Sequence, residues 1–291
     1  MAESVQALHR RAQRHLNRGE YGPLAACCKA ILAQRKDFAD AWFLLSVVAE
    51  AAGDLPRAEA LRARALELDS GNAEYLAQQA RLLSRLNRNA EALAAARGAL
   101  AAGPGNALGF DTAGVVLSRL GRYDEAQAAL AEAVRLAPDN PQYRFNLAAA
   151  EQFLGHAKAA EEHYRAALAL RPAFARAWWA LSELRKTGGS ADDLPALTAQ
   201  AARPDLSAED ALYLGHALAR AYELCGDHAA AFAALEKGKA GRRSRALDGR
   251  ARDAALFAAL RDSFAECDRE RRPRKAGDAT PLFVVGMPRT G

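Results

Sequence analysis

Cysteine and aromatic residues are scarce in this chain: its 291 residues include four cysteines, and aromatic residues make up 7% of it. No two cysteines form a CxxC pair, and none lies near a histidine at the spacing of metal ligands. We therefore expect no metal site, and we expect the cysteines to be small core residues in a reducing compartment. The four are Cys27, Cys28, Cys225 and Cys267.

Long apolar runs are also missing. The sequence has no window of about 18 uncharged apolar residues, which is the length that a membrane-spanning helix needs. Its first residues, "MAESVQALHRRAQRHL", are charged throughout and contain no apolar core of a signal peptide. We therefore expect a cytoplasmic protein without a membrane span.

Excess charge of one sign is absent from most of the chain. The formal net charge is +5, and the excess lies in residues 241–275, which hold eleven Lys and Arg against six Asp and Glu. Apolar residues recur at helical spacing over 247–268, so we expect a basic connecting helix within 241–272. Nucleic-acid binding is the alternative, which we disfavour because acidic residues are mixed through the helix and no aromatic residues alternate with the basic ones. We expect a packed stripe of Leu256, Phe257, Leu260 and Phe264, with Arg250, Arg252, Arg261 and Arg269 exposed.

What the chain does contain is an internal repeat. The phrases "GRYDEAQAALAEAVRLAPDN" and "GHAKAAEEHYRAALALRPAF" begin at Gly121 and Gly155, which are 34 residues apart, and Gly53 lies twice that distance before Gly121. Asn87 occupies the missing position. Alanines and prolines keep the same spacing, which is the signature of a repeat architecture. The markers are Ala58, Ala92, Ala126 and Ala160; Ala65, Ala99, Ala133 and Ala167; and Pro104, Pro138 and Pro172.

In these markers the chain resembles the tetratricopeptide repeat family. A large residue such as Trp42 or Trp178 opens each unit, and a small one such as Ser46 follows four positions later. The resemblance implies two helices per unit, with glycine at the turn and alanine where the helices cross. It predicts an all-α fold in which residues 1–240 form a right-handed superhelix of stacked helix pairs. The expected units are 5–38, 39–72, 73–106, 107–140 and 141–174, followed by two divergent helix pairs in which "TGGSADD" lengthens a turn and "LPALTAQAARPDL" forms a second helix out of register.

The resemblance also implies a partner. Such superhelices bind a protein or peptide along the concave face, which the first helix of each pair lines. Family members that grip a terminal carboxylate repeat Lys, Asn and Arg there, but here Asn146 alone fits, so we predict no carboxylate clamp. Trp178 matches a core marker, so the adjacent Trp179 points elsewhere; it is a candidate partner contact, with packing against a neighbouring helix as the alternative.

The last eleven residues raise a separate hypothesis. After a charged linker at 273–280, "PLFVVGMPRTG" (281–291) is typical of a buried strand that runs into a phosphate-binding loop. Gly286 and Gly291 have the spacing of a nucleotide-hydrolase P-loop, although its lysine would come next. The segment looks more like the loop of bacterial sulfotransferases, in which Arg289, Thr290 and Gly291 would bind the phosphosulfate of 3′-phosphoadenosine 5′-phosphosulfate.

Three functions follow as alternatives. By resemblance, the chain is the repeat region of a sulfotransferase, with a short strand left over from an α/β domain, and the repeats bind a protein or the acceptor. Because most of the sulfotransferase fold is missing, we expect the chain to be truncated and inactive alone. The second alternative is a non-enzymatic scaffold for protein–protein interaction. The third is a nucleotide hydrolase joined to repeats.

Overall fold

The computed structural model describes residues 3–184, 193–243 and 250–269. These residues form fifteen helices and no strand, which confirms the all-α fold class. The expected strand and loop at 281–291 and the linker at 273–280 lie outside the described residues. Contacts divide the chain into two compact units, Met1–Gly241 and Arg242–Gly291. In the part of the chain that is described, no helix has both the length and the hydrophobicity to cross a bilayer.

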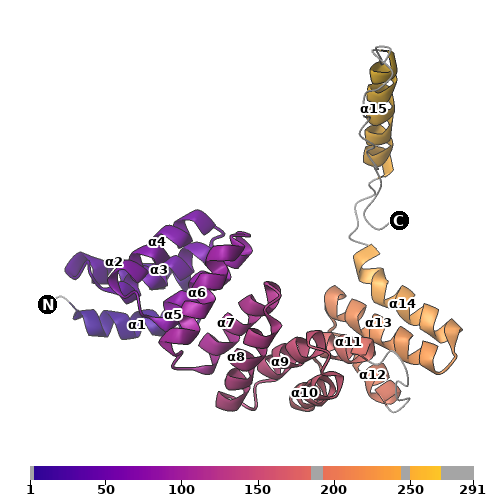
Figure 1. Ribbon diagram of the computed structural model, residues 1–291, viewed down its shortest axis with the longest axis horizontal. Coiled ribbons are helices and arrows are strands. Elements are labelled where there is room, and N and C mark those ends of the chain that lie inside the picture. Colours follow the sequence, from indigo (N-terminus) through magenta and orange to yellow (C-terminus); the bar gives the residue numbers. More distant parts are fainter. Residues whose placement is uncertain (1–2, 185–192, 244–249, 270–291) are drawn as a thin grey trace, which may run out of the picture. The chain divides into compact units, whose positions relative to one another are not determined.

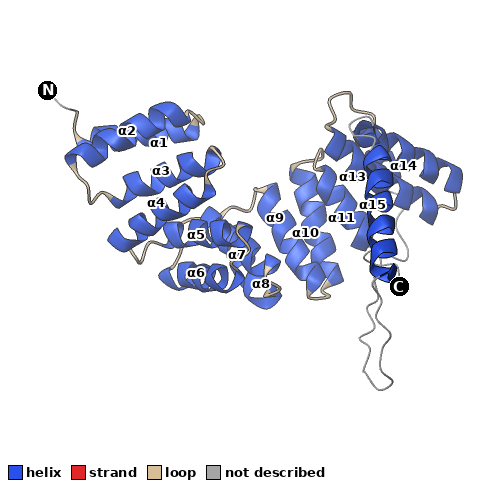
Figure 2. Cartoon of the chain, turned by 90° about the horizontal axis from the view of Figure 1, so that it is seen from above, coloured by secondary structure: helices blue, strands red, loops and turns tan. Residues whose placement is uncertain are grey.

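Ten helices of the first unit form five pairs, which lie one beside the next (Figures 1 and 2). In each pair the first helix has 13 residues and the second has 14, so a pair with its two connections repeats regularly. The paired helices expected from the repeat are therefore confirmed. The pairs are α1 (Val5–Asn17) and α2 (Tyr21–Gln34), α3 (Ala39–Ala51) and α4 (Leu55–Leu68), α5 (Ala73–Arg85) and α6 (Asn89–Ala102), α7 (Ala107–Arg119) and α8 (Tyr123–Leu136), and α9 (Pro141–Phe153) and α10 (Ala157–Leu170).

The turn inside each pair depends on one residue in the left-handed conformation. Gly121 has a φ of 73°, and Asn87 at the equivalent position has a φ of 59°. Asparagine tolerates this region better than other residues with a side chain. The Arg88 N–H then donates to the Leu83 carbonyl at 3.0 Å, which satisfies a carbonyl at the end of α5. The assignment of Asn87 to the glycine position is confirmed.

Small residues let the two helices of a pair approach closely. The eight alanines that recur at 34-residue spacing are all fully buried. Between α7 and α8 even a methyl group would not fit at Gly114, where a Cβ would lie 2.7 Å from Leu130 Cγ and 3.3 Å from the Ala126 carbonyl oxygen. The small residues at these close helix crossings therefore form much of the buried core.

At three of the first helices, the large residue near the start bonds to the connection that precedes the helix. Trp42 and Trp178 each donate the indole N–H at 2.9 Å to the carbonyl six residues earlier in the chain. Arg144, at the same repeat position, does so through Nε at 2.7 Å. Trp178 is 8% exposed and Trp179 is 39% exposed, which confirms the predicted difference between the two tryptophans.

The remaining helices of the first unit depart from the regular repeat. The second helix out of register is present as α12, but it has 8 residues and ends before Pro204. The next two helices meet at glycines, since a Cβ on Gly215 would lie 2.8 Å from the Gly238 Cα. The four helices are α11 (Ala175–Leu184), α12 (Leu194–Ala201), α13 (Ala208–Leu224) and α14 (His228–Arg243).

The second unit contains α15 (Arg250–Arg269), so the basic helix expected over 247–268 is present. Within this unit the four residues of its apolar stripe are exposed, from 44% at Leu260 to 70% at Phe257. Arg261 is exposed as expected. The side chains of Arg250, Arg252 and Arg269 lie outside the described part.

The cysteines divide into two groups. Cys27 and Cys28 are buried free thiols, as predicted, and burial raises the pKa of Cys28 to about 12. Cys225 is exposed, so its assignment to the core is wrong. It lies at the C-cap of α13, where the chain turns toward α14. The side chain of Cys267 is outside the described residues.

Candidate functional site

A fully buried arginine lies at the centre of the second helix pair. Nε of Arg62 (α4) donates to Ser46 Oγ at 3.2 Å, and Nη1 donates to the Gln78 carbonyl at 2.8 Å. Its Nη2 donates to Glu50 Oε2 at 3.0 Å. One side chain thus bonds α4 to both α3 and α5. Such partners are needed because removing a cation from water costs several kcal/mol.

Two further arginines reach the same carboxylate from α5. Arg85 Nη1 lies 2.5 Å and Arg81 Nη2 lies 3.1 Å from Glu50 Oε1. We call Glu50, Arg62, Arg81 and Arg85 the Glu50 cluster. The Glu50 side chain is 8% exposed, whereas Arg81 and Arg85 are 46% and 41% exposed. Three guanidinium groups therefore surround one carboxylate, and the positive excess lies on the exposed side.

The protonation of Glu50 is set by this environment. Burial by itself would raise the pKa of the carboxyl, but the hydrogen bond from Arg62 and the charges of Arg81, Arg62 and Arg85 outweigh it. The pKa of Glu50 consequently lies below its usual value. The carboxylate is ionised at neutral pH and holds the two exposed guanidinium groups in place.

The positive surface continues into the next pair. Arg119 lies at the end of α7, 34 residues after Arg85, so the two occupy equivalent positions in adjacent first helices. Arg119 is exposed, and among the described residues it has no ion-pair partner. We call Arg81, Arg85 and Arg119 the arginine face.

The first half of α7 carries a buried carboxyl. Asp111 of α7 accepts a hydrogen bond at 2.7 Å from Asn146 Nδ2 of α9. Burial raises the pKa of Asp111 to about 6, against the opposing effect of that hydrogen bond. A similar hydrogen bond spans 35 residues between α5 and α3, where Tyr75 Oη donates to Asp40 Oδ1 at 2.5 Å. Side-chain bonds between successive first helices therefore recur along the unit.

Two residues singled out in the sequence, Trp179 and Asn146, have partners within the protein. Trp179 is exposed, but its ring packs against that of Tyr213 in α13, with centroids 5.6 Å apart, so the packing alternative holds at least in part. The side-chain amide of Asn146 donates its hydrogen bond to Asp111 within the protein. The sequence-predicted site residues Arg289, Thr290 and Gly291 lie outside the described residues.

The Glu50 cluster was missed in the sequence, although a signal for it exists. Arg62 falls at a repeat position that is otherwise apolar and buried: Ala96, Leu130 and Tyr164 follow at 34-residue intervals. A charged residue at a core position requires a buried partner. Aligning the repeats column by column would have marked Arg62 as the exception.

Comparison with known proteins agrees with this geometry. A family model described as tetratricopeptide repeat matches residues 107–173. No curated protein matches the sequence. Among solved structures, YrrB, a TPR protein with an unusual peptide-binding site, is 22% identical, with 73% of this chain and 99% of that chain covered and a TM-score of 0.51.

Two further structures show the same fold. PilW, a type IV pilus biogenesis factor, is 18% identical with a TM-score of 0.55, covering 82% of this chain and 94% of that one. PilF of Pseudomonas aeruginosa is 20% identical with a TM-score of 0.53, covering 80% of this chain and 90% of that one. At such identities the likeness is one of fold. Residues 107–173 therefore match the tetratricopeptide repeat family, and the stacked helix pairs of this chain share the fold of these tetratricopeptide repeat structures.

Proposed function

We propose that this chain is a scaffold that binds an acidic segment of a partner protein on the arginine face. The observation that carries the proposal is the Glu50 cluster, in which three guanidinium groups share one carboxylate. A ligand carboxylate placed between Arg81 and Arg85 would offset the remaining positive charge. Guanidinium groups suit this role because their planar fork can bond a carboxylate with two parallel hydrogen bonds.

The arrangement also limits the entropic cost of binding. Arg81 Nε donates to Gln78 Oε1 at 2.9 Å, and the Glu50 contacts hold both exposed arginines. Side chains that are ordered before the ligand arrives lose less freedom on binding. Peptide binding by a protein of this fold has a precedent in YrrB, whose structure is described as having an unusual peptide-binding site. At 22% identity that precedent concerns the fold and does not identify the ligand.

The test begins with a peptide library that is not biased in charge, displayed on phage and selected against the purified full chain. We expect the recovered peptides to be enriched in Asp and Glu. The affinity of a recovered peptide should fall at least about tenfold in Arg81→Gln/Arg85→Gln, which removes two charge-assisted contacts.

The matched control is Arg64→Gln/Arg135→Gln, which removes the same charge from exposed arginines of the second helices α4 and α8. Peptide affinity should be unchanged in this control at fixed ionic strength. Recovery of no binding peptide would refute the scaffold function. Recovery of neutral peptides, or equal losses in the two double variants, would refute the arginine face as the site.

A second function is proposed on the sequence of 281–291 alone. The likeness of "FVVGMPRTG" to a sulfotransferase loop supports a parent enzyme in which the repeats bind a protein or the acceptor, while Arg289, Thr290 and Gly291 contact the phosphosulfate of the donor. A sulfotransferase loop needs the surrounding sheet, so we expect this chain alone not to bind 3′-phosphoadenosine 5′-phosphosulfate. Isothermal titration calorimetry tests this, and micromolar affinity would contradict it. The coding sequence after codon 291 is a second test: Ser or Thr supports the sulfotransferase, and Lys the nucleotide hydrolase.

A further inference from the structure

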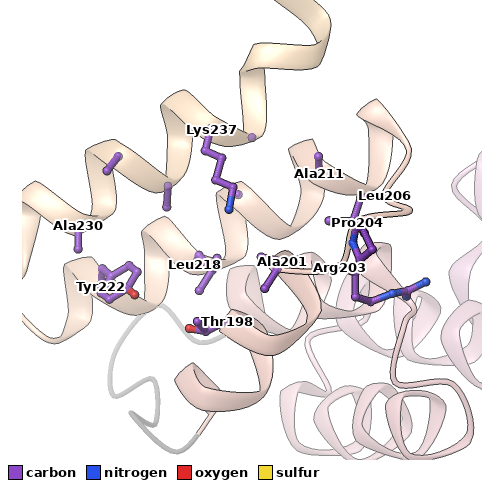
Figure 3. Close-up of a pocket in the computed structure, with 15 residues that line it drawn as sticks. Thr198, Ala201, Arg203, Pro204, Leu206, Ala211, Leu218, Tyr222, Ala230 and Lys237 are labelled. Carbon is purple, nitrogen blue, oxygen red and sulfur yellow. The ribbon is translucent and has the colours of Figure 1, made fainter.

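The shortened helix α12 leaves one side of α13 uncovered. The second helix of each regular pair has 14 residues, but α12 has 8, and residues 202–207 then lead directly into α13. A cavity of about 560 Å³ lies in the space between α12, α13 and α14 (Figure 3). Its size falls within the range of about 300–1,000 Å³ that is typical of small-ligand pockets.

The cavity wall is mainly apolar. Leu206, Leu218 and the ring of Tyr222 line it, together with small residues from all three helices. One reason for the lining of small residues is the backbone contact of α13 with α14, where Gly215 and Gly238 meet. An apolar ligand would therefore replace water against carbon-rich surface, which favours its binding.

One free cation accompanies this wall. Lys237 lines the cavity, and Figure 3 shows its side chain extending from α14 toward α12 and α13. Among the described residues Lys237 has no ion-pair partner, and no acidic side chain lines the cavity. The other lining cation, Arg203, is already bonded to Asp205 at 3.1 and 2.6 Å, and in Figure 3 its guanidinium points away from Lys237.

We propose that this cavity binds a small amphipathic carboxylate, with its apolar body against Leu218 and Tyr222 and its carboxylate on Lys237 Nζ. The charge follows from the unpaired ammonium, and the apolar body follows from the wall. The site is separate from the arginine face and does not depend on the proposed scaffold function.

The test compares three ten-carbon probes that differ in charge: decanoate, decanol and decylamine. Binding of each to the full chain is measured below its micellar concentration by calorimetry. We expect decanoate to bind at least about tenfold more tightly than decanol, because a carboxylate–ammonium contact next to apolar surface is a charge-assisted hydrogen bond. Decylamine should bind most weakly.

Two substitutions locate the binding. Lys237→Met should lower the affinity for decanoate at least about tenfold and leave the affinity for decanol unchanged, since the substitution keeps an apolar stem and removes the charge. The control is Lys239→Met, whose residue lies on the same helix but does not line the cavity. This variant should change neither the decanoate nor the decanol affinity. Ala233→Phe fills the cavity from an exposed lining position and should abolish binding of both probes, with the circular dichroism spectrum unchanged.

Each contrary result overturns the proposal. Equal affinities for the three probes would refute a carboxylate as the ligand, and so would a lack of decanoate binding. Decanoate binding that survives Ala233→Phe would place the probe on another apolar surface. If sedimentation shows that the chain without probe self-associates and Ala233→Phe abolishes this, the occupant is a second copy of the chain.

Discussion

Arg62 and Glu50 form a buried ion pair in which Nη2 lies 3.0 Å from Oε2, and their side chains are 0% and 8% exposed. The pair has two consequences. It bonds α4 to α3 inside the stack, and through the second oxygen of Glu50 it positions the exposed arginines Arg81 and Arg85. Stability of the second pair and the geometry of the proposed binding face therefore depend on the same carboxylate.

Removing that carboxylate should be costly. Glu50→Ala leaves Arg62 buried without its anion, and breaking a buried pair in this way lowers the free energy of unfolding by about 3–5 kcal/mol. The control on the next helix is Glu67→Ala, whose pair with Arg64 is 62% and 50% exposed and is worth less than about 1 kcal/mol. Urea unfolding followed by circular dichroism measures both, and similar losses would contradict a special role of Glu50.

Replacing the cation should be less costly than removing the anion. In Arg62→Leu, Glu50 keeps its contacts with Arg81 and Arg85, and leucine already occupies the equivalent position at Leu130. Removing one partner of a buried pair is costly mainly because the other charge is left uncompensated, and here Glu50 keeps two guanidinium partners, so we expect a loss below about 2 kcal/mol. A loss as large as that of Glu50→Ala in the same urea experiment would show that the arginine itself is required.

Two glycines at helical positions should respond in opposite ways to the same substitution. Gly114→Ala forces a Cβ to within 2.7 Å of Leu130 Cγ, and overpacking of this kind destabilises by about 1–3 kcal/mol. At Gly98 the nearest atom to a Cβ is Leu76 Cδ1 at 3.7 Å, so Gly98→Ala should stabilise the chain by about 0.5–1 kcal/mol. Thermal unfolding of both variants measures this difference, and a shift of the same sign in both would refute it.

The turn at Asn87 provides a test of backbone conformation. Its φ of 59° is compatible with Asn and Gly but not with alanine. Asn87→Ala should lower the free energy of unfolding by about 1 kcal/mol, whereas Asn87→Gly should leave it unchanged or raise it slightly. If thermal melts show no difference between the two variants, the left-handed turn is not what this position requires.

The regular pairs were predictable because a repeat shows the same physical requirement several times. Asn87 was assigned to a turn by comparison with Gly53, Gly121 and Gly155, and the buried alanines by their shared spacing. The candidate sites were not predictable in this way. The Glu50 cluster depends on side chains that meet across helices, and the cavity depends on where α12 ends. Features that occur once have no second copy in the sequence to support them.

Asp111 should make stability depend on pH, in a direction that can be worked out. Burial raises the pKa of this carboxyl from 3.8 to about 6, so between these values the folded protein holds the proton more tightly. Stability therefore falls as pH rises from about 4 to 6, by about 2–3 kcal/mol at 1.36 kcal/mol per pH unit, and stays lower above that range. Asp111→Asn cannot ionise, so its stability relative to wild type should rise by this amount between pH 4 and pH 8 in urea titrations. Asn146→Ala removes the hydrogen bond that lowers the folded-state pKa and should extend the upper end of this pH range. A constant difference between Asp111→Asn and wild type would mean that Asp111 ionises as readily in the folded chain as in the unfolded one.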